Sequence, residues 1–319
     1  MCIIMESSLV QQHLISLDYL SKTQMEGLFQ KAQELSDLSI EQTGELLRNK
    51  ILAVMFFQPS TRTRLSFETA MLKLGGRIIG FQDFKTTRAG DFFQETLADT
   101  VRVVAQMADA MVIRHFKSQA CEEAASISSI PVINAGDGAN EHPTQALSDI
   151  WLLSKIKGEL VNLNIGLVGD IDNRSLYAIL IGLIKFPIKK IFLLLPPNKK
   201  VSLRVKDTLE KNNIMYVTCN SMDDILYNVD CILMIPFIVP EFEKPHIEPT
   251  GRKFQLDDKF ILNKKRFLKA GRKIPILHTG PRGPELSTDM DELQEFMFFS
   301  QVKESVFMRM AILHSLVGE

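Results

Sequence analysis

Cysteine and proline are scarce in this chain of 319 residues. Its four cysteines form no CxxC pair, so the sequence predicts neither a zinc knuckle nor a thioredoxin-like redox pair. With 17 glycines and 13 prolines, the chain also lacks the composition of a collagen-like or low-complexity protein. The default expectation is therefore a protein of the reduced, cytoplasmic compartment without a structural metal.

Long hydrophobic runs are missing as well. The longest apolar runs, Ile51–Phe57 and Ala178–Ile184, span seven residues, whereas a membrane-spanning helix needs about 20. The first residues lack the basic region and apolar stretch of a secretory signal peptide. No membrane partner is expected.

Neither sign of charge dominates the chain. Lys and Arg number 37, and Asp and Glu number 38, so the formal net charge is 37 − 38 = −1. Without an overall basic field, the chain has no general attraction for nucleic acid or for an anionic membrane. Any anion-binding site must therefore be local.

Short apolar runs alternate with helix-length segments throughout the chain. Continuous apolar strands separated by helices are typical of parallel sheets covered on both faces. Two such sets predict an α/β fold with two doubly wound parallel-sheet domains joined by helices, the boundary lying in a helix within Gln145–Asn162. The expected strands are Ile51–Phe57, Arg77–Phe81, Ala110–Arg114, Pro131–Asn134, Ile165–Val168, Ile191–Leu195, Tyr216–Thr218, Cys231–Ile235 and Ile274–His278.

The first strand leads into a segment of hydroxyl and guanidinium side chains at the start of a helix. Free N–H groups and the helix dipole favour a phosphate at such a position. The donors that this segment offers are Ser60, Thr61, Arg62, Thr63 and Arg64. The alternative is a helix capped by Ser60 or Thr61 with two solvated arginines. No P-loop motif is present, and no GxGxxG follows Ile165–Asp170, so a dinucleotide cofactor is not expected.

A second motif follows the strand at Pro131–Asn134. Ala135–Gly138 and His142–Gln145 come after that strand and precede a helix. Both motifs lie at carboxyl ends of strands, where ligands bind in parallel sheets, so both can face one ligand site. Alternatively, His142 is a cap or a hydrogen-bonding residue.

Together these motifs resemble the signatures of aspartate carbamoyltransferase catalytic chains, of the aspartate/ornithine carbamoyltransferase superfamily. Ser-Thr-Arg-Thr-Arg followed about 80 residues later by His-Pro-Thr-Gln is a specific combination, and the match is collinear over nearly the whole chain. The matching segments are Ser60–Thr69, Glu95–Thr100, Arg114-His115, Asn134–Gly138, His142–Gln145, Val168–Asp170 and His278–Arg282.

The resemblance implies a domain organisation and an assembly. Residues 1–150 would form a carbamoyl phosphate-binding domain, completed by a C-terminal helix at 301–319, and residues 151–300 would form an acceptor-binding domain. The family's catalytic unit is a trimer with sites at subunit interfaces, so a homotrimer or a multiple of it is expected. The reaction needs carbamoyl phosphate, an amine acceptor and no metal or organic cofactor.

The resemblance also implies roles for individual residues. An amine attacks the carbonyl carbon of carbamoyl phosphate, and phosphate leaves. Thr63, Arg114 and His142 would polarise the carbonyl oxygen, Gln145 would orient the carbamoyl NH₂, and Arg174 would bind the acceptor's carboxylate. The complete set of implied carbamoyl phosphate ligands is Ser60, Thr61, Arg62, Thr63, Arg114, His142 and Gln145.

The acceptor half departs from the family pattern. Phe93 stands where the family has a lysine that reaches a neighbouring subunit's site, and Lys85 or Arg88 is either a replacement or a solvated surface charge. Pro236-Phe237-Ile238 stands where the aspartate enzymes have Arg-x-Gln. Gly280 is a further departure from the family pattern, in the turn His278–Arg282.

After Pro236 the chain enters a loop longer than the family's. Arg252 or Lys253 within it could fold back as a substitute cation, although a surface role is the better expectation for both. Loops of this length in a compact domain are usually functional or disordered.

Three functions remain open from the sequence. The chain is a carbamoyltransferase with an altered acceptor site, an ordinary aspartate carbamoyltransferase of pyrimidine biosynthesis with compensating contacts, or a non-catalytic homologue that assembles with or regulates a partner. Retention of Arg62, Arg114, His142 and Gln145 together argues against the third, because random drift would not spare one half of a dead site.

Overall fold

The computed structural model describes residues 12–83, 85, 87–89, 95–237 and 256–318. These residues form two compact units. Within the described part of the chain, unit 1 comprises residues 12–148 and 302–318, and unit 2 comprises residues 149–237 and 256–301. The borders between the units fall inside two helices, α6 (Pro143–Lys157) and α11 (Phe298–Val317).

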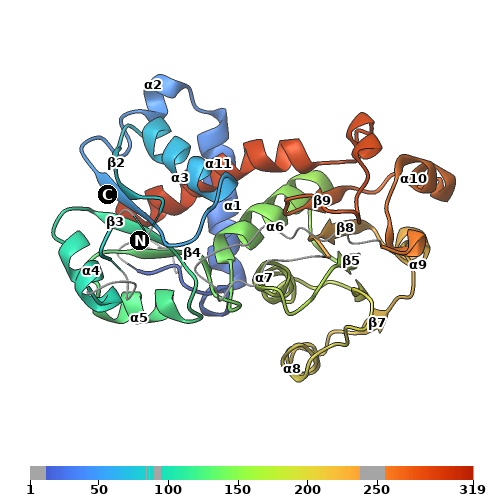
Figure 1. Ribbon diagram of the computed structural model, residues 1–319. Coiled ribbons are helices and arrows are strands. Elements are labelled where there is room, and N and C mark those ends of the chain that lie inside the picture. The colour runs from blue at the N-terminus through green and yellow to red at the C-terminus, as the bar shows by residue number, and fades with distance from the viewer. Residues whose placement is uncertain (1–11, 84, 86, 90–94, 238–255, 319) are drawn as a thin grey trace. The chain divides into compact units, whose positions relative to one another are not determined.

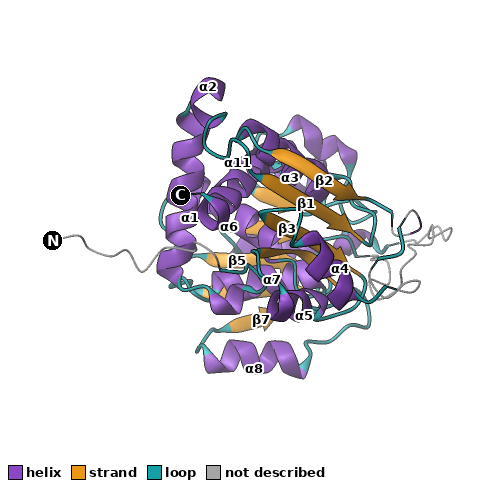
Figure 2. Ribbon diagram, turned by 90° about the vertical axis from the view of Figure 1, so that its left-hand side faces the viewer, coloured by secondary structure: helices purple, strands orange, loops and turns teal. Residues whose placement is uncertain are grey.

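Unit 1 is built on a sheet of four parallel strands in the order β2-β1-β3-β4, of which β2, β1 and β3 are labelled in Figure 2. These strands are β1 (Ile51–Phe56), β2 (Arg77–Phe81), β3 (Ala110–His115) and β4 (Val132–Asp137). The register pairs Phe56 with Arg114 and His115 with Asp137. The carboxyl ends of β1, β3 and β4 are therefore neighbours at one edge of the sheet.

The helices of unit 1 begin and end at local sequence signals (Figure 1). The side chains of Ser21 and Gln24 form a capping box at the start of α1. Helix α3 ends at Lys73 and is followed by Gly75, whose φ of 82° is left-handed, and the Gly76 N–H donates to the Met71 carbonyl. Apart from α6 and α11, the helices are η1 (Leu17–Tyr19), α1 (Lys22–Asp37), α2 (Ile40–Thr43), α3 (Arg62–Lys73), α4 (Leu97–Val104) and α5 (Ala120–Ile127).

Unit 2 contains a sheet of five parallel strands in the order β7-β6-β5-β8-β9. Its strands are β5 (Asn164–Val168), β6 (Lys190–Leu194), β7 (Tyr216–Thr218), β8 (Cys231–Met234) and β9 (Ile276–His278). Its helices are α7 (Arg174–Leu183), α8 (Leu203–Lys211), α9 (Met222–Asn228), η3 (Asp258–Phe260), α10 (Lys264–Ala270) and η4 (Thr288–Glu292). The strand order reverses between β5 and β8, so the carboxyl ends of these strands are the expected ligand-binding position of this sheet.

The predicted α/β class and all nine predicted strands are confirmed. The strands form because continuous apolar runs can be buried on both faces of a parallel sheet, as the buried residues of β3 show. The largest difference is at β4, which ends at Asp137 and not at Asn134. Its pairing with β3 resumes after an irregularity, and Gly136 adopts a φ of 109° that favours glycine.

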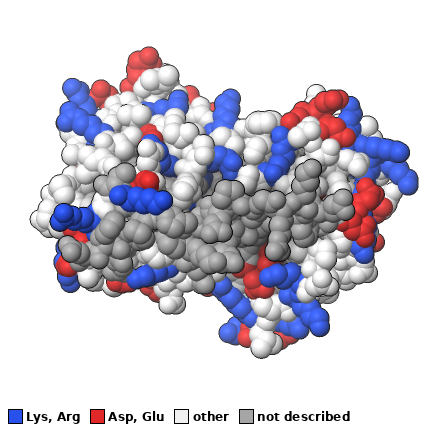
Figure 3. Space-filling view, in the orientation of Figure 1, with Lys and Arg blue, Asp and Glu red and all other residues white. Residues whose placement is uncertain are grey.

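The surface charges and the apolar length of the helices agree with what the composition predicts. On the face shown in Figure 3, basic and acidic side chains are interspersed among the residues that are drawn in colour. Among the described helices, none is long and apolar enough to cross a membrane.

Candidate active site

The segment between β1 and α3 ends in a helix N-terminus without a side-chain cap. Thr61 occupies the cap position in an α-helical conformation, and its side chain makes no capping hydrogen bond. The alternative of a helix capped by the Thr61 hydroxyl is therefore wrong. Thr61 is exposed and Ser60 is half-buried, whereas Thr63 in the first turn is buried. The dipole of this 12-residue helix favours an anion at that end.

Two arginines provide positive charge at the same end of the sheet. Arg114, the β3 residue beside Phe56, is buried, and its Nη1 donates to the Ala135 carbonyl at 3.3 Å. Burial, and then the charge of Arg62, lower the pKa of Arg114 to about 10. Burial also lowers the pKa of Arg62. Two partly desolvated guanidinium groups that repel each other form a site that an anion would stabilise.

His142 contacts this site directly. Its Nε2 lies 3.3 Å from Thr63 Oγ1, and its Nδ1 lies 3.4 Å from Thr144 Oγ1. The ring is buried. Gln145 is half-buried in the first turn of α6, where its N–H donates to the His142 carbonyl at 3.1 Å. The structure thus places Thr63, His142 and Gln145 on adjoining segments of unit 1.

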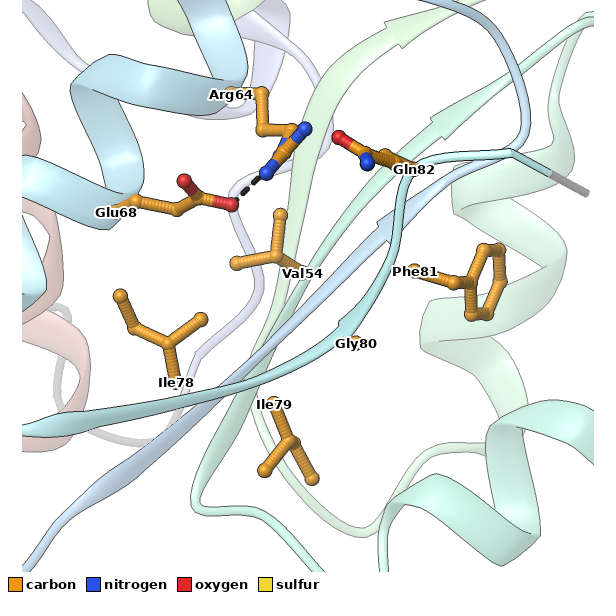
Figure 4. Close-up of a pocket in the computed structure, with 8 residues that line it drawn as sticks. All are labelled: Val54, Arg64, Glu68, Ile78, Ile79, Gly80, Phe81 and Gln82. Atoms are coloured by element: carbon orange, nitrogen blue, oxygen red, sulfur yellow. Dashed lines mark hydrogen bonds and ion pairs between the residues drawn. The ribbon is translucent and has the colours of Figure 1, made fainter. Parts of the chain in front are cut away.

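Arg64 pairs with a carboxylate on its own helix, which competes with the expected role of Arg64 as a donor to phosphate. Its Nε donates to Glu68 Oε1 at 2.6 Å on the same helix. Both side chains line a cavity of about 410 Å³ (Figure 4). In that view Gln82 lies beside Arg64, and the wall is formed by aliphatic residues of β1 and β2. Arg64 is therefore committed to a neighbouring carboxylate.

In unit 2, Arg174 is the first residue of α7, directly after the β5 loop. It is almost fully buried, with 1% of its surface exposed. The Asn173 side chain caps the helix by accepting from the Ser175 N–H at 2.9 Å. Because β5 and β8 flank the point where the strand order reverses, Arg174 lies at the expected ligand position of this sheet.

The residues after β8 are apolar and buried. Pro236 and Phe237 are both buried, and the Phe237 ring packs against Phe260 with centroids 5.8 Å apart. The Phe237 N–H donates to Glu285 Oε2 at 3.3 Å. Within the described residues at this position there is thus no guanidinium corresponding to the family's Arg-x-Gln. Ile238, Arg252 and Lys253 lie outside the described residues.

A buried histidine–glutamate pair holds the turn after β9. His278 Nδ1 accepts from the Gly280 N–H at 2.9 Å, so Nε2 carries the proton that faces Glu285 Oε1 at 3.1 Å. The Gly283 N–H donates to the same oxygen at 2.7 Å. Burial alone would raise the pKa of Glu285, but the hydrogen bond from His278 and the backbone N–H donors bring it below its ordinary value. The sequence patterns did not predict Glu285, because a single glutamate in a turn has no local signal.

Of the loop cations, Lys85 and Arg88 are both exposed. Phe93, which stands at the family's lysine position, lies outside the described residues. The structure therefore leaves the roles of Lys85 and Arg88 as sequence expectations.

Comparison with known families identifies the family of this chain. The family model for the aspartate/ornithine carbamoyltransferase carbamoyl-P binding domain matches residues 12–155, and the model for the Asp/Orn binding domain matches residues 161–316. The chain belongs to the aspartate/ornithine carbamoyltransferase family. The resemblance expected from the motifs is confirmed, and so is membership of a family of carbamoyltransferases.

Relatives in this family cover almost the whole chain. The aspartate carbamoyltransferase catalytic subunit of Clostridium acetobutylicum is 38% identical over 271 residues, which are 84% of this chain and 86% of that protein. The catalytic subunit of Aliivibrio fischeri is 35% identical over 317 residues, which are 99% of each chain. Aspartate transcarbamoylase from Trypanosoma cruzi, solved in complex with carbamoyl phosphate and aspartate, has a TM-score of 0.84 at 28% identity and covers 98% of both chains.

Proposed function

We propose that this chain transfers the carbamoyl group of carbamoyl phosphate to the amine of an amino acid. The main support is the cluster in unit 1, where Arg62 and Arg114 are close enough to repel each other and His142 Nε2 lies 3.3 Å from Thr63 Oγ1. The aspartate transcarbamoylase of Trypanosoma cruzi, a structural relative, was solved with carbamoyl phosphate.

In the proposed reaction the acceptor's neutral amine forms a bond to the carbonyl carbon, and the bond from that carbon to the phosphate oxygen breaks. The proton that the amine loses passes to the departing phosphate. Negative charge develops on the carbonyl oxygen and on the departing phosphate, so fixed donors at both positions lower the barrier. Thr63, Arg114 and His142 serve the carbonyl oxygen, and Gln145 orients the carbamoyl NH₂. The phosphate ligands are Ser60, Thr61, Arg62 and Thr63.

For the acceptor, we propose an amino acid whose binding depends on Arg174 and on a single carboxylate. A buried guanidinium is a good bidentate partner for one carboxylate, and Arg174 is almost fully buried. Pro236 and Phe237 follow β8 and offer no charged side chain for a second carboxylate. Aspartate, which has two carboxylates, is then a poor acceptor, because one of them lacks its partner.

A second candidate is ordinary aspartate carbamoylation. Relatives that are 33–38% identical to this chain are named aspartate carbamoyltransferase catalytic subunits, which favours aspartate. In that case Lys85, Arg88, Arg252 or Lys253 would supply the missing positive charge. The two candidates share the chemistry at carbamoyl phosphate and differ in the acceptor.

Phosphate release from carbamoyl phosphate, assayed against a panel of amino acids and other amines, tests the shared chemistry. We expect release above the uncatalysed background with at least one amine and its loss in the His142→Gln variant. Exposed Lys269→Ala on α10 in unit 2 is a control that should keep the activity. If no amine stimulates release while the chain is folded, the non-catalytic alternative replaces this proposal.

A further inference from the structure

The segment before η1 lies along the free edge of β4 in unit 1. The Leu14 N–H donates to the Val132 carbonyl at 2.9 Å, and the Leu14 carbonyl accepts from the Asn134 N–H at 2.9 Å. Leu14 and Ile133 form a parallel bridge. This segment therefore covers an edge strand whose backbone groups would otherwise be exposed.

The same segment also contacts β4 itself and the end of the loop between β4 and α6. Within β4, Asn134 Nδ2 donates to the Ile15 carbonyl at 2.9 Å. At the end of the loop, Ser16 Oγ donates to Glu141 Oε1 at 2.6 Å, and the Leu17 N–H donates to Glu141 Oε2 at 3.2 Å. Ser16 and Glu141 are buried, so these charge-assisted hydrogen bonds are little weakened by water.

Glu141 is joined directly to His142, whose ring lies against Thr63. We propose that Ser16 and Glu141 are positioning residues that fix His142 for the carbonyl oxygen of carbamoyl phosphate, an inference that rests on the proposed function. The contact of His142 Nε2 with Thr63 Oγ1 is 3.3 Å, near the upper limit for a hydrogen bond, so a small movement of the loop would break it. Misplacement of a catalytic group by about 1 Å can cost about 100-fold in rate.

Two variants each remove one partner of the hydrogen bond between Ser16 and Glu141. Ser16→Ala removes the hydroxyl donor, but it also removes the cap of η1, because Ser16 Oγ accepts from the Asp18 N–H. Glu141→Ala removes the acceptor and leaves that cap in place. Tyr19→Phe is the matched control, because it removes an exposed 2.8 Å hydrogen bond from the same short helix to Glu122 on α5.

Equilibrium binding of two probes separates positioning from a merely structural effect. Inorganic phosphate reports on the phosphate ligands alone. Phosphonoacetamide, a hydrolysis-resistant analogue of carbamoyl phosphate, also has the carbonyl group that His142 would contact. By calorimetry, Ser16→Ala and Glu141→Ala should weaken phosphonoacetamide about fivefold and leave phosphate within about twofold of the wild type. Tyr19→Phe should change neither affinity, and Ser16→Thr, which keeps a hydroxyl, should restore the wild-type value.

A double-mutant cycle shows whether the effect passes through His142. In the His142→Gln background, Ser16→Ala should cost nothing further, because the group that it positions is absent. Equal weakening of both probes, no weakening of either, or full additivity with His142→Gln would overturn the inference. A wild-type chain that binds no phosphate would instead overturn the proposed function, and the inference with it.

Discussion

Arg62 and Arg114 in unit 1 show how the charge of one side chain can favour the binding of an anion. Arg62 lowers the pKa of Arg114 by charge repulsion in a buried setting, which disfavours the unliganded state. An anion between them would relieve that repulsion and gain charge-assisted hydrogen bonds. The phosphate site should therefore depend strongly on Arg62.

Arg62→Ala should weaken phosphate binding by about 1.5–3 kcal/mol, the range for a hydrogen bond to a charged group. Titration calorimetry with inorganic phosphate measures this difference. Arg64→Ala is the control, because Arg64 pairs with Glu68. The affinity of this variant for phosphate should stay within about twofold of the wild type. An unchanged affinity in Arg62→Ala would remove the main support for the phosphate assignment.

Glu285 should make the stability of unit 2 dependent on pH. Its pKa in the folded protein lies below the ordinary value of 4.5, so its stabilising effect is complete above that pH and is lost as the pH falls through the folded-state pKa. Glu285→Gln replaces one acceptor oxygen with a donor that faces existing donors. It should lower the free energy of unfolding by about 2 kcal/mol at pH 7 and flatten the acid dependence.

Urea unfolding between pH 3 and pH 7 measures both effects. Glu292→Gln is the control, since Glu292 forms an exposed ion pair with Lys264 and should change the free energy of unfolding by about 0.5 kcal/mol or less. Equal acid sensitivity in Glu285→Gln and the wild type would contradict the role of the buried pair.

Sequence motifs indicated which residues are candidates for the site, but not which side chains those residues contact. The segment Ser60–Arg64 contains Arg62 and Arg64, but the direction in which each side chain points depends on its position around the helix axis and on tertiary packing. Arg64 therefore pairs with Glu68, which the motif did not reveal. The Ser16–Glu141 contact joins residues 125 positions apart and has no local signal.

At the scale of elements, the order of parallel strands brings the site together. Adjacent carboxyl ends of β1, β3 and β4 bring the start of α3, Arg114 and the His142 loop to one edge. Apolar runs predicted these strands because both faces of each strand are covered. The bounds of β4 were harder to predict, because its last residues, Gly136 and Asp137, are typical of turns.

The loop between β4 and α6 should be sensitive to Gly138. Its φ is 46°, and a Cβ there would lie 2.3 Å from the Ser118 nitrogen. Gly138→Ala should lower the free energy of unfolding by about 1–3 kcal/mol and should lower kcat for carbamoyl transfer more than the affinity for phosphate. Urea unfolding and steady-state kinetics measure these effects.

Gly271 provides the matched control for that loop. It also has a left-handed φ, of 65°, but no atom lies within 4 Å of the position of its Cβ. Gly271→Ala should therefore cost about 1 kcal/mol of stability through backbone strain alone and leave kcat unchanged. Equal loss of kcat in both variants would contradict a local effect of Gly138 on the site.

At the scale of the whole molecule, we propose a homotrimer or a multiple of it. The family resemblance implies this assembly. In addition, three large apolar side chains on α3 and β2 are exposed: Leu65 at 50% and Leu72 at 63% on α3, and Ile79 at 39% on β2. Exposed apolar side chains are candidates for contacts with another subunit. Sedimentation velocity at micromolar concentration should show a trimer or a multiple, and a fully active monomer would contradict the proposal.

The family could be predicted from the sequence, whereas the acceptor could not. The motifs proposed to bind carbamoyl phosphate are each contiguous in the sequence, so they remain recognisable in one chain. Recognition of the acceptor depends on single side chains such as Arg174 and Pro236, whose effect is set by the buried groups around them. The replacement of a charged residue by Pro236 identifies a difference but does not name the molecule that fits it.

The values of kcat/KM for aspartate and for amino acids with one carboxylate show which acceptor the chain uses. We expect carbamoyl transfer with a value for aspartate well below about 10⁴ M⁻¹s⁻¹, the lower end for typical enzymes. It also predicts at least one monocarboxylate acceptor that is used about tenfold better or more. A value for aspartate at or above about 10⁴ M⁻¹s⁻¹, with no better acceptor in the panel, would contradict the account and identify an ordinary aspartate carbamoyltransferase.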